Sequence, residues 1–133
     1  MWRANPRRGT VLAAAALLAC VSFCGAASAA DTVNLTGRWA CDDGGTYYIR
    51  QNGNQVWWLG QSGNGGADWT NVLHGGIRGD AVVGDWSDVP AGAALNSGTL
   101  TLELVFRHGR VVEIRKRKQV GDGFGGGVWT RAD

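Results

Sequence analysis

After residue 30, glycines divide the chain into short runs of residues that favour β-strands, and this division limits the folds the chain can adopt. Glycine accounts for 22 of the 133 residues and proline for only 2. Valine, leucine, isoleucine, threonine and aromatic residues fill the runs between the glycines, and no run shows the long apolar periodicity of a helix. We therefore expect an all-β fold of short strands and tight turns.

Eight runs can be assigned to strands. They cover residues 35–39, 46–51, 55–61, 69–77, 81–87, 97–106, 111–118 and 128–131. The clearest hairpin signal is Asn52-Gly53-Asn54, because asparagine and glycine tolerate the positive φ that tight turns need. The longest irregular connection is residues 88–96, which contains Pro90.

Short links between consecutive strands predict an antiparallel up-and-down meander. A meander of eight strands removes its exposed edges when it closes into a barrel. The alternative is a two-sheet sandwich, but Greek-key sandwiches need longer crossover connections than this chain offers. We therefore expect a small closed barrel.

The apolar pattern differs between strands. Within residues 97–106, leucines alternate with polar residues, which is typical of a strand with one buried face. Residues 56–59 (Val-Trp-Trp-Leu) and residues 69–73 are instead apolar on both faces. Because a barrel strand has only one inner face, these two strands predict an exposed patch, a subunit interface or a ligand platform on the outside.

The first 30 residues have the pattern of a secretory signal peptide. Arg3, Arg7 and Arg8 precede an uncharged apolar run at residues 11–24, and small residues follow at 26–30. The apolar run is too short to cross a bilayer, which needs ~20 residues. We expect residues 1–30 to be removed and a single domain, residues 31–133, to be secreted or periplasmic.

Cysteine use leaves two questions open. Leu17-Leu18-Ala19-Cys20 loosely matches a lipobox, so a lipoprotein anchored at Cys20 is the alternative, and Arg7-Arg8 loosely matches a twin-arginine export signal. Removal of residues 1–30 leaves Cys41 as the only cysteine, so no internal disulfide can form. We expect Cys41 to be a small buried side chain, with an intermolecular disulfide as the alternative.

Removal of the signal also changes the charge. The full chain has 13 basic and 11 acidic residues, but three of the basic residues and none of the acidic residues precede residue 31. Ten basic and eleven acidic residues remain, a net charge of about −1, which gives no indication of a nucleic-acid partner. We interpret the basic cluster at residues 115–118 as a solvated rim, with attraction of anionic glycans or lipid headgroups as the alternative.

No catalytic pattern stands out. His74 and His108 are far apart in sequence, and no serine lies in a Gly-x-Ser-x-Gly motif. Asp85 and Asp88 flank a turn and are interpreted as solvated, and residues 42–43 lack the later acidic ligands of an EF-hand. We expect a non-catalytic protein with no metal, no cofactor, no nucleic-acid partner and no transmembrane span.

The start of the domain resembles a known group of barrels. Residues 35–39 (Leu-Thr-Gly-Arg-Trp), a short loop and residues 45–49 (Gly-Thr-Tyr-Tyr-Ile) look like the opening hairpin of avidin-type proteins. Gly-x-Trp, here Gly37 and Trp39, is also the mark of the wider calycin group, which includes the lipocalins. The resemblance implies that a late arginine packs over this tryptophan, and Arg131 is placed to do so.

Biotin binding is not implied by this resemblance. Avidins place hydrogen-bonding side chains just after that tryptophan and at the start of the second strand, where this chain has Cys41 and Gly45. A buried urea group would lose those hydrogen bonds, at ~1–3 kcal/mol each. Lipocalin barrels are also longer than this chain, which leaves less room here for a deep cavity.

Aromatic residues are the candidate binding groups. Six of the seven tryptophans follow residue 30, and rings on a sheet can stack on sugars or other flat ligands. Neighbouring Trp57 and Trp58 must point to opposite faces, so only one of them can fill the core. The candidate binding residues are Tyr47, Trp57, Trp58, Trp69 and Trp86; those expected to be structural are Gly37, Trp39 and Arg131.

These observations predict an exported barrel that binds a small hydrophobic ligand or a glycan through aromatic side chains. The alternative is a protein-interaction or inhibitor module, or a homo-oligomer, that uses an outer apolar face of the sheet. The ligand and the oligomeric state stay open at this point.

Overall fold

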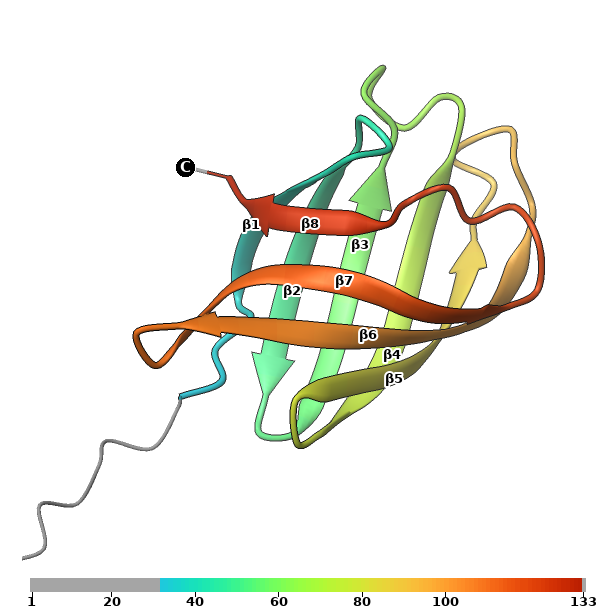
Figure 1. The fold of residues 1–133 in the computed structure, drawn as a ribbon. Coiled ribbons are helices and arrows are strands. Elements are labelled where there is room, and N and C mark those ends of the chain that lie inside the picture. Colours follow the sequence, from blue (N-terminus) through green and yellow to red (C-terminus); the bar gives the residue numbers. More distant parts are fainter. Residues whose placement is uncertain (1–31, 133) are drawn as a thin grey trace, which may run out of the picture.

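The computed structural model describes residues 32–132, which form a closed antiparallel barrel of eight strands without a helix (Figure 1). The strands are β1 (Gly37–Cys41), β2 (Thr46–Asn52), β3 (Gln55–Gln61), β4 (Thr70–Arg78), β5 (Ala81–Asp88), β6 (Ser97–Arg107), β7 (Arg110–Val120) and β8 (Val128–Arg131). Each strand pairs with the next, and β8 pairs with β1 to close the barrel. The prediction of a closed barrel is confirmed, and the alternative of a two-sheet sandwich is not what the structure shows. The predicted signal peptide, with Cys20, lies outside the described residues.

Six of the eight strands have limits that differ from the expectation by one or two residues, and the shifted starts of the first and fourth strands affect the two ends of the barrel. The first strand begins at Gly37, two residues later than expected, because Leu35 lies beneath the end of the barrel and accepts a hydrogen bond of 2.9 Å from Trp39 Nε1. Gly37 then turns the chain into β1 with a φ of 143°, and a Cβ there would lie 3.4 Å from Arg131 Nη1. Trp69 precedes β4 and is the last residue of a loop.

The connections differ at the two ends of the barrel. Turns at residues 53–54, 79–80 and 108–109 join β2 to β3, β4 to β5 and β6 to β7 at one end, here called the turn end. The other four connections are longer loops, at residues 42–45, 62–69, 89–96 and 121–127. Because connections of a meander alternate between its ends, the four loops surround the opposite end, here called the mouth (Figure 1).

Large side chains fill the inside of the barrel. Trp39, Tyr47, Leu100 and Trp129 have no exposed surface, and the inward leucines of β6 are buried as the alternation predicts. The interior of the barrel is therefore a packed core.

Arg131 and Trp39 close the turn end. The guanidinium carbon of Arg131 lies 4.5 Å from the ring centroid of Trp39, an arrangement worth ~0.5–2 kcal/mol. The same guanidinium donates hydrogen bonds to the backbone oxygens of Val111, Thr36 and Asn34. The prediction that Arg131 packs over Trp39 is confirmed.

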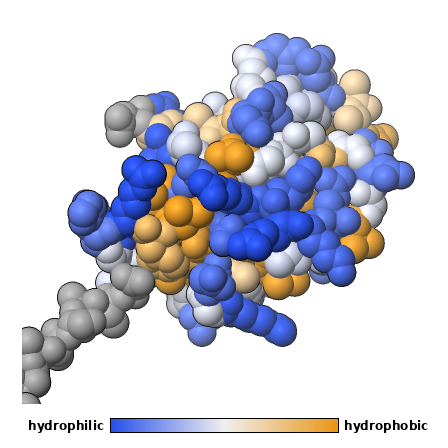
Figure 2. All heavy atoms as spheres, in the orientation of Figure 1, coloured by the Kyte–Doolittle hydropathy of each residue, from blue (hydrophilic) through white to orange (hydrophobic). Residues whose placement is uncertain are grey.

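The outside of β2–β5 carries the exposed apolar patch that the sequence predicts. Five large apolar side chains there are 38–48% exposed. We call this surface the outer apolar face; its members are Tyr48, Trp57, Leu59, Val72 and Val83. The outside of β6 and β7 carries ion pairs by contrast, and Figure 2 shows hydrophilic atoms over the middle of these two strands and an apolar patch over their turn end.

The basic cluster at residues 115–118 does not lie wholly on a solvated rim. Arg115 and Arg117 point outward and form ion pairs with Glu113 and Glu103. The pairing of β7 with β6 shifts register between Lys118 and Lys116, and Lys116 is half-buried. The rim interpretation is therefore wrong for Lys116.

Candidate functional site

Four of the five candidate aromatic residues lie together in one cluster. The ring of Tyr47 contacts Trp58 and Trp69, with centroids 5.1 and 5.8 Å away. Phe124 links Trp58 to Trp86, with its centroid 6.2 and 5.0 Å from theirs. Tyr47, Trp58 and Trp86 are buried and Trp69 is half-buried. These rings form the floor and wall of the mouth.

Trp57 is separate from this cluster. It is 42% exposed whereas Trp58 is 3% exposed, so the prediction that the two neighbours point to opposite faces is confirmed. The Trp57 indole stacks on His74 of β4, with centroids 4.8 Å apart and planes 15° from parallel. Nε2 of His74 lies 2.8 Å from Oε1 of Gln55. Trp57 therefore belongs to the outer apolar face.

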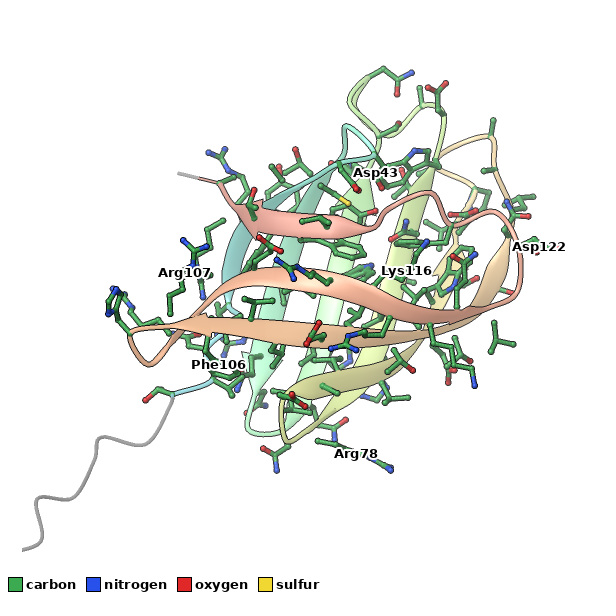
Figure 3. All side chains as sticks on the ribbon, viewed as in Figure 1. Asp43, Arg78, Phe106, Arg107, Lys116 and Asp122 are labelled. Atoms are coloured by element: carbon green, nitrogen blue, oxygen red, sulfur yellow. The ribbon has the colours of Figure 1, made fainter. Side chains whose placement is uncertain are left out.

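A small pocket opens at the mouth, beside the aromatic cluster. Its volume is about 40 Å³, and it is lined by Asp43, Tyr47, Trp69, Asn71, Asp88, Gly123, Phe124 and Gly125. Asp43 is labelled at this end of the barrel in Figure 3. A water molecule takes up ~30 Å³ in the liquid, whereas sites for whole small molecules measure ~300–1,000 Å³. The pocket therefore has room for one substituent of a ligand and no room for a whole ring.

Asn71 is a rigidly held polar residue of this pocket. It is 3% exposed, and its Oδ1 accepts a hydrogen bond of 2.8 Å from Trp58 Nε1. Its partner across β3 is Gly60, where a Cβ would lie only 2.7 Å from Asn71 Oδ1 and 2.5 Å from Tyr47 Cε1. Glycine at position 60 therefore makes room for the asparagine and for the tyrosine ring.

Asp43 and Tyr47 form a second polar pair at the pocket. The phenol of Tyr47 donates a hydrogen bond of 2.7 Å to Asp43 Oδ2, and the backbone N–H of Gly45 donates one of 2.8 Å to Asp43 Oδ1. Burial, and then the hydrogen bond to Asp43, raise the pKa of Tyr47 above its ordinary value. The phenol therefore stays protonated and the carboxylate of Asp43 is the acceptor.

Asp88 is the third polar group of the pocket. It is 9% exposed, and its Oδ2 accepts a hydrogen bond of 2.9 Å from the backbone N–H of Asn96. Asp85 lies on the outside of β5 and accepts a hydrogen bond from Thr99 Oγ1. The interpretation of these aspartates as a solvated pair is wrong for Asp88, because residues three apart on a strand face opposite sides.

Phe124 covers the cluster from a glycine-rich loop. Its ring is buried, and Lys116 Nζ lies 5.6 Å from the ring centroid and donates a hydrogen bond of 3.1 Å to the Phe124 carbonyl. The carboxylate of Asp42 accepts hydrogen bonds from the backbone N–H groups of Gly127 and Val128, which lower the pKa of Asp42. Two charged side chains therefore hold this loop over the mouth.

Two indole N–H groups beside Phe124 have no partner. Nε1 of Trp86 and Nε1 of Trp129 are buried and make no hydrogen bond within the described residues. A buried donor without a partner costs ~1–3 kcal/mol. The mouth half of the core thus carries polar groups that packing alone does not satisfy.

Cys41 is a buried free thiol beneath the mouth. Burial raises its pKa, so the thiol stays protonated and unreactive. The Sγ–H donates a hydrogen bond of 3.4 Å to Asp42 Oδ1. The structure agrees with the prediction of a small buried side chain.

Sequence reasoning missed four residues of the site, Asp43, Asn71, Asp88 and Phe124, although clear signals for two of them exist. Asn71 lies two residues before the inward Leu73, and Asp88 lies two residues after the inward Trp86, so strand alternation places both inside. Phe124 gives only a weak signal, as the one large side chain in a run of glycines. Its position over the core depends on how the loop crosses the mouth.

The fold and the site define a small closed β-barrel with a packed interior and a polar-aromatic pocket at one mouth. Within residues 32–132, no group of three or more His, Cys, Asp or Glu side chains is placed to hold a metal ion. The described part of the chain also contains no helix with the length and apolarity to cross a membrane. Comparisons with protein-family models, curated proteins and solved structures gave no match to this chain. The resemblance to avidin-type and calycin barrels stays a prediction.

Proposed function

We propose that this protein is a non-catalytic binding module that holds a hydroxyl-rich ligand, such as the terminal sugar of a glycan, at the mouth of the barrel. The observation that supports this proposal most is the pocket itself. Three hydrogen-bonding side chains, Asp43, Asn71 and Asp88, meet aromatic rings around a space of about 40 Å³.

The chemistry of the lining suits a sugar. Carboxylate and amide oxygens accept hydrogen bonds from hydroxyl groups, and the C–H faces of sugars stack on aromatic rings. The volume fits a hydroxyl or hydroxymethyl substituent, and the half-buried ring of Trp69 offers a surface for the sugar ring outside the pocket. A purely hydrophobic ligand would cover Asp43 and Asp88 without giving them hydrogen bonds, at a cost in free energy. The glycan is therefore favoured over the hydrophobic ligand.

The packed interior limits the strength of binding. A ligand at the mouth is only partly enclosed, whereas tight small-molecule sites bury most of their ligand. We expect dissociation constants of the order of 1 mM for single sugars, about −4 kcal/mol. Longer glycans that extend across the mouth loops should bind more tightly.

Titration with a panel of monosaccharides and short glycans, followed by two-dimensional NMR, tests the proposal. We expect ligand-dependent shifts at the Asn71 side-chain amide and the Trp69 indole. Trp69→Ala and Asp88→Asn should weaken binding about tenfold or more, because each removes one contact of the site. No shift with any saccharide, or full binding by both variants, would contradict the proposal.

Two matched controls lie outside the pocket. Trp57→Ala removes an exposed tryptophan of the outer apolar face, and Asp85→Asn removes an exposed carboxylate from the same strand as Asp88. Both control variants should bind the saccharide as the original protein does. Circular dichroism of each variant verifies that the barrel has formed.

A further inference from the structure

The outer apolar face concentrates most of the exposed apolar surface. Seven large apolar side chains of the described residues are exposed, and five of them lie on this face; the other two are Leu95 and Val120. The strand register places Tyr48, Leu59 and Val72 in one row across β2, β3 and β4. A contiguous apolar area with two aromatic rings is typical of the centre of a protein interface.

A second row crosses the same face and carries opposite charges at its ends. The register places Arg50 beside Trp57, Trp57 beside His74, and His74 beside Asp85. Arg50 on β2 and Asp85 on β5 are both exposed, and neither takes part in the ion pairs formed within residues 32–132. The face is therefore apolar in the middle, positive on its β2 side and negative on its β5 side.

This arrangement is complementary to itself. A two-fold axis that runs along the strands between β3 and β4 places β3 of one copy against β4 of the other. Trp57 then meets His74 of the second copy, and Leu59 meets Val72, at the ~10 Å spacing of packed sheets. The positive β2 side of each copy lies opposite the negative β5 side of the other, so the charges at the rim attract.

We propose that two copies of this protein form a two-fold symmetric dimer through the outer apolar face. The partner is a second copy because the charge pattern of the face complements its own rotated image. The contact lies on the side of the barrel, away from the mouth, so it goes beyond the ligand binding proposed above and can fail independently of it.

Sedimentation velocity of the purified protein over roughly 5–500 μM tests the dimer. We expect the original protein to sediment as a dimer and Leu59→Lys to bind its second copy at least about 30-fold more weakly, because a lysine would enter the apolar contact. Leu95→Lys is the matched control, since it adds the same charge at an exposed leucine outside the face, and should leave the dimer unchanged. Val72→Lys is the second disrupting variant, in case Leu59→Lys fails to fold.

A charge exchange tests the two-fold arrangement. Arg50→Asp alone should weaken the dimer about 3–10-fold at low salt, because negative rims then face each other. The double variant Arg50→Asp, Asp85→Arg should recover most of the original affinity. Its β2 side is negative and its β5 side is positive, so opposite charges again face each other across the two-fold axis. A monomer at all concentrations, a dimer that both lysine variants leave intact, or no recovery in the double variant would overturn the proposal.

Discussion

At the turn end of the barrel a cation covers a tryptophan, and at the mouth a cation covers a phenylalanine. Arg131 lies 4.5 Å from the Trp39 centroid, and Lys116 lies 5.6 Å from the Phe124 centroid. Trp39 belongs to a strand and its indole N–H is satisfied by the Leu35 carbonyl. Phe124 belongs to a loop, and two indole N–H groups near it have no partner among residues 32–132. The turn end therefore has its indole N–H satisfied, whereas the mouth has buried indole N–H groups that no described residue satisfies.

The two ends also differ in charge. The four mouth loops contain no lysine or arginine and four aspartates, namely Asp42, Asp43, Asp68 and Asp122. At the turn end, arginines flank the short turns; Arg78 and Arg107 are labelled there in Figure 3, opposite Asp43 and Asp122. A negative mouth disfavours anionic ligands and is compatible with a neutral sugar.

The largest expected loss of stability follows from a substitution at the turn end. Trp39→Ala should lower the free energy of unfolding by about 3–5 kcal/mol, because it removes a fully buried ring and the surface on which Arg131 packs. Urea unfolding measures this loss. Trp39→Phe, which keeps a ring but loses the hydrogen bond to Leu35, should lose less and remains measurable if the alanine variant does not fold. A loss below about 1.5 kcal/mol for alanine would show that the turn end is not the stable closure.

A smaller loss is expected at the mouth. Phe124→Ala should lower the free energy of unfolding by about 1–3 kcal/mol, less than Trp39→Ala, because its glycine-rich loop can collapse into the space. The same urea experiment compares the two variants. Equal losses would mean that the mouth is as rigid a closure as the turn end, and the contrast between the ends would be lost.

The smallest expected effect on stability comes from Asp42, whose carboxylate holds the loop at residues 121–127 through backbone hydrogen bonds. Backbone hydrogen bonds from Gly127 and Val128 lower the pKa of Asp42 below its ordinary value of 3.8. A carboxyl group whose pKa is lower in the folded state stabilises the fold above its unfolded pKa, and this contribution is lost as the pH falls through the folded pKa. Asp42→Asn should therefore melt at a lower temperature at pH 7, and the difference should vanish toward pH 2.

Thermal unfolding at several pH values between 7 and 2 measures this difference. Asp68→Asn, in another mouth loop, is the control for the loss of one negative charge. A difference between Asp42→Asn and the original protein that stays constant over the whole pH range would show that the carboxylate charge does not hold the loop.

Much of the barrel could be predicted because its strands are encoded locally. Alternation in residues 97–106 gave the buried leucines of β6, and Asn52-Gly53-Asn54 marked the hairpin of β2 and β3. Short links gave the strand order. The start of β1 was predicted two residues too early, because Leu35 continues the apolar pattern while its backbone already bends over the end of the barrel.

The candidate site could be predicted only in part. Aromatic residues are conspicuous in the sequence, and the opposite orientations of Trp57 and Trp58 follow from adjacency. The same alternation indicates that the polar side chains of Asn71 and Asp88 point inward, but neither residue belongs to a recognisable sequence motif. The pocket depends on loops from three different connections, at residues 42–45, 62–69 and 121–127, and no local pattern indicates how these loops meet.

The sequence by itself determined the class of fold, the strands, and which side of each strand is apolar, because backbone geometry and side-chain alternation act over a few residues. Only the tertiary structure decided that Tyr47, Trp58, Trp69 and Trp86 share one cluster, that Phe124 covers it, and that Trp57 lies apart on the outer apolar face. Those contacts join residues distant along the chain, and they arise from closure of β8 on β1 and from the passage of residues 121–127 over the mouth.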